Sequence, residues 1–151
     1  PQFAENDIKM SSLDLKDTSI VWTHDFPETY KEEYGDDIRD FLPELIWELP
    51  KGMPSLARYR YHQHSTKRFT EAFAHQIGKW CKENGIILSG HMMGEDSLGS
   101  QAKHIGEAMA AYGDFGIPGM DLLCDNVLLA TAKQTQSAVH QYGKEGMLSE
   151  L

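Results

Sequence analysis

Three short apolar runs, each beginning a strand-length segment, constrain the fold of this chain more than any other feature. The runs Ile86–Ser89, Ile117–Leu123 and Met147–Leu151 begin roughly 30 residues apart, which is the length of one strand-and-helix unit. Segments 100–112 and 131–142 lie between them and have helical spacing. Continuous apolar runs are typical of strands buried on both faces. The order predicts an α/β fold with a parallel sheet and helical crossovers.

The first half of the chain has helical patterns instead. Residues 29–34 predict a short helix, and helical spacing returns over 38–49. Pro43 is expected to divide that second pattern, because proline lacks an amide hydrogen and crowds the preceding turn. The longest predicted helix covers 56–84. Its large apolar residues share one face, and we expect that face to be core: Phe69, Phe73, Ile77 and Trp80.

The number of strands suggests that the domain is incomplete. Three parallel strands leave two unpaired edges, whereas a closed (β/α)8 barrel needs about 250 residues. The 151 residues could therefore supply only part of a barrel. The sequence begins without a strand or a cap and stops as a strand starts. We expect residues 1–151 to be an internal fragment of a larger barrel.

Composition argues against several classes of partner. The formal net charge is −9 and the basic residues are scattered, which does not favour nucleic-acid binding. No apolar run approaches the roughly 20 residues that span a bilayer, so no membrane partner is expected. The two cysteines, Cys81 and Cys124, form no metal-type CxxC pair and are interpreted as reduced thiols. A cytoplasmic location follows, although a signal peptide could precede Pro1.

Acidic residues and one histidine follow the predicted strands. His91, Glu95 and Asp96 come after the first, Asp121 lies near the end of the second, and Glu150 ends the third. Parallel α/β proteins place their sites at these carboxyl ends. His91 could equally be bonded to a backbone carbonyl, and Asp96 could favour the start of the next helix. Asp121 interrupts an apolar run and needs a partner or a substrate, whereas spacing leaves the role of Glu150 open.

Other motifs are weak or missing. The sequence contains no GxGxxG, GxxxxGK[ST] or GxSxG pattern. His62 and His64 are two residues apart, so on a helix they point to different faces, which does not favour a metal site. Trp22, in the N-terminal loop, is a candidate for substrate binding because an aromatic face suits the apolar face of a sugar ring. Packing of Trp22 against the rim of the barrel is an equal alternative.

A family resemblance covers nearly the whole chain. The segments that carry it are "PELIWELP", "ARYRYHQHSTKRFTEAFAHQIGKWCKENGI", "SGHMMGEDSLGSQ", "YGDFGIPGMDLLCD" and "AKQTQSAVHQYGKEGMLSEL". Together they resemble a group of largely uncharacterised bacterial glycoside hydrolases with (β/α)8 barrels, loosely related to α-L-rhamnosidases and to β-galactosidase-like barrels. The resemblance implies that residues 1–54 form a long excursion after barrel strand four. It implies that residues 55–151 supply a helix and then strands five to seven.

The resemblance also implies roles for the strand-end residues. Glu150 takes the position of one catalytic carboxylate, and the acid/base glutamate would precede Pro1. His91, Glu95 and Asp121 take rim positions that hold sugar hydroxyls. Glycoside hydrolysis needs two carboxylates, whose separation decides between retention and inversion. The expected partners are a carbohydrate and the remainder of the parent barrel, and no cofactor is expected. The sugar, the linkage and the stereochemical outcome stay open.

Two alternatives from other classes also fit the sequence. One is a carbohydrate-binding or interaction module without catalysis, built on a degenerate barrel. The other is a metal-dependent hydrolase that uses His91, Glu95 and Asp121. One histidine with two carboxylates suits a hard cation such as calcium better than zinc.

Overall fold

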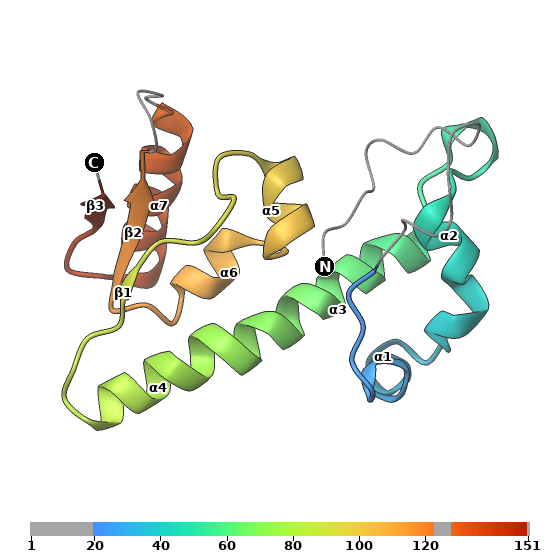
Figure 1. Cartoon of the computed structure of the whole chain (residues 1–151), viewed down its shortest axis with the longest axis horizontal. Helices are drawn as coiled ribbons and strands as arrows, with labels where there is room; N and C mark the ends of the chain where they lie inside the picture. Colours follow the sequence, from blue (N-terminus) through green and yellow to red (C-terminus); the bar gives the residue numbers. More distant parts are fainter. Residues whose placement is uncertain (1–19, 123–127, 151) are drawn as a thin grey trace. The chain divides into compact units, whose positions relative to one another are not determined.

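The computed structural model describes residues 20–122 and 128–150 (Figure 1). The chain divides into two compact units, Pro1–Ser65 and Thr66–Leu151, and the division falls within the helix α3 (Leu56–Thr70). The predicted end of the second strand at Leu123 lies outside the described residues, as do Cys124 and the last residue, Leu151.

The first unit is helical. Helix α1 (Phe26–Tyr34) covers the predicted short helix and begins three residues earlier. The next helical pattern is divided, as predicted, into a 3₁₀ turn (Ile38–Phe41) and α2 (Leu42–Ile46), and Pro43 lies in the first turn of α2. A further 3₁₀ turn (Pro50–Gly52) leads to α3. The buried apolar side chains of this unit are Phe26, Tyr30, Ile38, Leu45 and Tyr61.

The long predicted helix exists, but a π-helical turn interrupts it. α3 is followed by the π turn (Glu71–His75) and then by α4 (Gln76–Glu83). The expectation that its large apolar face is core is wrong. Between 36% and 57% of the surface of each of these side chains is exposed: Phe69, Phe73, Ile77 and Trp80. The helix instead turns small side chains inward, since Ala74 and Cys81 are buried.

The second unit contains the predicted parallel sheet. Its strands are β1 (Ser89–Gly90), β2 (Ile117–Asp121) and β3 (Leu148–Glu150), in the order β1-β2-β3. The three strands lie side by side (Figure 1), and Ser89 pairs with Ile117 and Asp121 with Glu150, both in parallel register. The architecture is therefore α/β with an open, three-stranded parallel sheet.

Helices connect the strands. α5 (Leu98–His104) and α6 (Ala108–Tyr112) stand where one helix over 100–112 was expected, and α7 (Leu129–Tyr142) matches the helix predicted over 131–142. Gly106 separates α5 from α6 and has a φ of 83°, a left-handed conformation that cannot continue a helix. The buried apolar core of this unit lies between the helices and the sheet: Ala74, Met92, Ile105, Ala108, Ala111, Tyr112, Phe115 and Ala138.

The expectation that the strands are buried on both faces is wrong for the outer two. Ile86 and Ile87 precede β1 instead of forming it, and both are exposed, as is Leu148 in β3. The ladder between β1 and β2 is short, with only the pairs Ser89–Ile117 and Gly90–Pro118. Only the middle strand is partly enclosed, with Pro118 and Gly119 buried.

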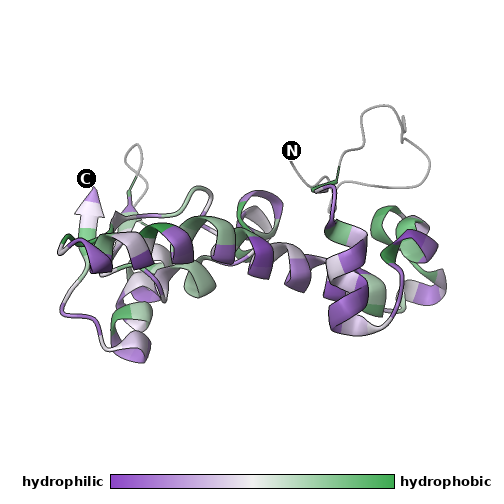
Figure 2. Ribbon diagram, turned by 90° about the horizontal axis from the view of Figure 1, so that it is seen from below, coloured by the Kyte–Doolittle hydropathy of each residue, from purple (hydrophilic) through white to green (hydrophobic). Residues whose placement is uncertain are grey.

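Hydrophobic and hydrophilic residues are interspersed along the long helices (Figure 2). Among the described residues, none of the helices has the length and apolar character needed to cross a membrane.

Candidate functional site

Three polar side chains meet at the carboxyl ends of the strands. Asp121 is the last residue of β2, Glu150 is the last residue of β3, and His91 directly follows β1. The Nε2 atom of His91 lies 3.4 Å from Oε2 of Glu150 and 3.8 Å from Oδ2 of Asp121. The parallel register causes this convergence, because it carries all three strand ends to one edge of the sheet. Three of the predicted site residues are thus brought together.

The geometry fixes which His91 nitrogen faces the acids. Ionised carboxylates only accept hydrogen bonds, so Nε2 must carry a hydrogen to interact favourably with either one. Both distances exceed the usual range of an N–H···O hydrogen bond, about 2.7–3.2 Å, so a substrate hydroxyl or a water molecule could bridge them. Nδ1 of His91 is buried and has no hydrogen-bond partner within the described ranges.

Glu95 stabilises the site through two hydrogen bonds of its buried carboxylate. Its side chain is buried, and its Oε1 accepts a hydrogen bond of 2.8 Å from the backbone N–H of Asp121. Its Oε2 accepts a short hydrogen bond from the hydroxyl of Tyr112. Glu95 therefore holds the end of β2 to helix α6, and its predicted contact with substrate stays a prediction. Burial, and then the adjacent Glu95 carboxylate, raise the pKa of the Tyr112 phenol above its ordinary value.

A cavity of about 500 Å³ opens at this edge of the sheet. That volume falls in the range of small-molecule sites, about 300–1,000 Å³. Its polar wall contains His91, Glu95 and Asp121, whereas Glu150 lies outside the lining. Its apolar wall comes from Met92, Met93 and Leu128. The complete lining is His91, Met92, Met93, Gly94, Glu95, Asp96, Asp121, Leu128 and Thr131. The cavity thus offers both hydrogen-bond acceptors and an apolar surface.

The remaining candidates lie elsewhere or act differently. Trp22 belongs to the first unit, where its ring stacks on Phe26 with centroids 5.2 Å apart. Its predicted role in substrate binding stays a prediction. Asp96 is exposed and lines the cavity, whereas Ser97 caps α5 through its Oγ, which accepts from the backbone N–H of Ser100.

Within the described ranges, no group of three or more His, Cys, Asp or Glu side chains is arranged to hold a metal ion. The engagement of Glu95 with Asp121 and Tyr112 explains why the donor set expected for calcium is not assembled. Cys81 is a buried free thiol, in agreement with its interpretation as reduced.

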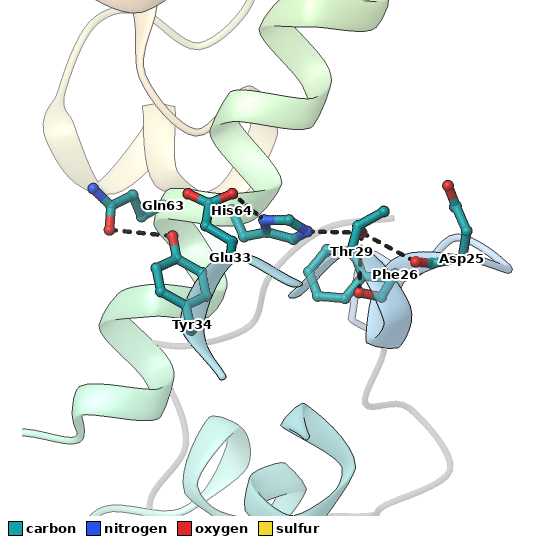
Figure 3. Close-up of polar contacts among 7 residues, drawn as sticks. All are labelled: Asp25, Phe26, Thr29, Glu33, Tyr34, Gln63 and His64. Atoms are coloured by element: carbon teal, nitrogen blue, oxygen red, sulfur yellow. Dashed lines mark hydrogen bonds and ion pairs between the residues drawn. The ribbon is translucent and has the colours of Figure 1, made fainter. Parts of the chain in front are cut away.

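A second polar cluster, in the first unit, was missed by the sequence reasoning. The imidazole of His64 is buried, and its Nδ1 lies 3.1 Å from Oε2 of Glu33 while its Nε2 lies 2.9 Å from Oγ1 of Thr29 (Figure 3). The rings of Phe26, Tyr30 and Tyr34 surround it, with centroids 4.9, 5.7 and 6.0 Å away. The signal available in the sequence was the four-residue spacing of Thr29 and Glu33 on one face of α1.

The order carboxylate, imidazole, hydroxyl is that of a nucleophile triad, but the hydrogen bonds argue for a structural clamp. Oγ1 of Thr29 donates to helical carbonyl oxygens, 3.0 Å from that of Asp25 and 3.2 Å from that of Phe26. A hydroxyl has a single hydrogen, so these two carbonyl oxygens compete with Nε2 of His64 for it, whereas a nucleophile would be committed to the imidazole. The cluster therefore fastens α1 to α3 and is not the candidate active site.

No protein-family model, curated protein or solved structure matches the chain.

Proposed function

We propose that this chain is part of the catalytic (β/α)8 barrel of a glycoside hydrolase. The observation that carries the proposal is the placement of two carboxylates, Asp121 and Glu150, within 4 Å of one imidazole nitrogen at the carboxyl edge of a parallel sheet. That edge is where barrel enzymes hold their substrates. The unpaired outer edges of β1 and β3 support the proposed barrel, because further strands would pair with these edges in a closed barrel.

Each residue has a role in the proposed chemistry. The Glu150 side chain is 68% exposed, so it is accessible to attack an anomeric carbon or to activate water. Asp121 is only 13% exposed and its backbone is held by Glu95, which suits a fixed acceptor for a sugar hydroxyl. His91 donates through Nε2 to the same hydroxyl or to Glu150. The second catalytic carboxylate is, on this proposal, a glutamate that precedes Pro1 in the parent protein.

The test is Glu150→Gln in the longer protein that would contain this chain, assayed with a panel of aryl glycosides. The substitution keeps the shape of the side chain and removes its charge. We expect kcat to fall by about 10²–10⁴-fold, the usual contribution of a positioned catalytic side chain, while sugar binding measured by calorimetry is retained.

The matched control is Glu145→Gln, at an exposed position before the amino end of β3 and outside the cavity. It should leave kcat unchanged. Unchanged turnover in Glu150→Gln would remove Glu150 from the mechanism. Sugar binding by the unsubstituted protein without any turnover would favour the non-catalytic carbohydrate-binding module instead.

A further inference from the structure

A second hollow lies at the opposite edge of the sheet, beside the amino ends of the strands. Its volume is about 490 Å³, close to that of the cavity at the carboxyl edge. Its walls come from α4, from the segment that leads into β1, and from the turns that precede β2 and β3. All of its residues belong to the second unit. The proposed hydrolase chemistry does not use it.

Three lysines line this hollow in a protein whose net charge is −9. Lys79 and Lys82 are three residues apart on α4 and therefore share a face. Both are exposed, and their side chains make no hydrogen bond or ion pair with the described part of the chain. Lys144 is better fixed, since its Nζ donates a hydrogen bond of 2.8 Å to the carbonyl oxygen of Gly113. An ammonium group has three donors, so two remain for a ligand.

The single carboxylate among the lining residues, that of Asp114, already has a partner within the hollow. Asp114 Oδ1 lies 2.9 Å from Nδ1 of His75, which also lines the hollow. The three ammonium groups therefore outweigh the single carboxylate, and the hollow attracts anions although the protein as a whole repels them.

The other wall is apolar. Ile86 and Ile87 are exposed there, and Leu88 and Phe115 complete the surface. A simple inorganic anion would leave these side chains in water, whereas an anion with an apolar body would cover them. We propose that this hollow binds a small organic anion, in which a phosphate or carboxylate group meets the lysines and an apolar body packs on the isoleucines.

The experiment titrates the 151-residue chain with four probes and follows its backbone amide NMR signals. Phenyl phosphate and phenylacetate combine charge with an apolar ring, inorganic phosphate supplies charge alone, and benzyl alcohol supplies the ring alone. We expect at least one of the first two to bind more tightly than both of the others, with shifts at the residues of the hollow. Preference between these two probes then identifies the anionic group.

The variant Lys79→Gln/Lys82→Gln should weaken that binding about tenfold or more, because two charge-assisted contacts are removed. The control Lys103→Gln/Lys133→Gln makes the same change in net charge at lysines that do not line the hollow, and should change affinity little. Amide signals away from the substitutions report whether each variant is folded. Equal binding of benzyl alcohol, equal binding of inorganic phosphate, or equal losses in the two variants would each overturn the proposal.

Discussion

Gly78 shows how a single small residue decides which face of α4 is buried. A Cβ atom at this position would lie 2.4 Å from the backbone carbonyl oxygen of Asp114, closer than non-bonded atoms approach. The same side of the helix carries Ala74 and Cys81, both buried. The larger side chains of the neighbouring stripe, from Phe69 to Trp80, would not fit so close to the Asp114 turn, which explains why that stripe is exposed.

We expect Gly78→Ala to destabilise the chain, even though alanine favours a helix over glycine by about 1 kcal/mol. The obstructing atom belongs to the backbone, so relief requires a shift of α4, and overpacking of this kind costs about 1–3 kcal/mol. Urea unfolding followed by circular dichroism measures the change. Gly146→Ala is the control, because its Cβ would meet nothing within 4 Å. A Gly78→Ala protein as stable as the control would contradict the close approach.

At the scale of elements, the hydrogen bonds of Glu95 join helix α6 to the end of β2. They predict that the stability of the folded chain decreases at alkaline pH. The Tyr112 phenol has its pKa raised above the ordinary 10.0 by burial and by Glu95. The unfolded chain therefore ionises this phenol near pH 10 while the folded chain keeps it protonated. The contribution to stability is complete below pH 10 and is lost as the pH rises above it.

Tyr112→Phe tests this link. We expect the variant to lose about 1–3 kcal/mol of stability near neutral pH, because one oxygen of buried Glu95 loses its donor. Its stability should also fall less steeply between pH 9 and about 11 than that of the unsubstituted chain, as measured by urea unfolding at each pH. Tyr59→Phe is the control, at an exposed tyrosine on α3. Identical pH profiles for all three proteins would contradict the raised pKa of Tyr112.

The elements that periodicity could predict are those whose signal is local. The helices near 29–34 and 131–142 and the parallel order of the strands follow from spacing alone, and the structure confirms them. The buried face of α3 and α4 could not be predicted, because the apolar stripe and the small-residue stripe have the same period. The break at Gly106 depends on one left-handed residue, and the sequence pattern does not distinguish it from a helical glycine.

The residues of the candidate site could also be predicted from a local signal, namely their position after a strand. His91, Asp121 and Glu150 were found because each follows a strand, and parallel strands end together. Glu95 was found by the same rule, but its burial depends on Tyr112, which the pattern assigns to an apolar helix. The clamp between Glu33 and His64 joins residues 31 positions apart and leaves only a weak local signal.

At the scale of the whole molecule, the ends of β1, β2 and β3 bring His91, Asp121 and Glu150 together at one edge of the sheet. Side chains that act together on one substrate do not contribute independently, so their substitution should be non-additive. All three residues belong to the second unit.

The most direct measurement is a double-substitution cycle on turnover in the longer protein, with His91→Gln, Glu150→Gln and the two combined. Because Nε2 of His91 lies 3.4 Å from Oε2 of Glu150, the combined variant should lose little more activity than Glu150→Gln alone. The parallel cycle of His91→Gln with Glu145→Gln should show no coupling. Losses that simply multiply for His91 and Glu150 would contradict a shared site at the strand ends.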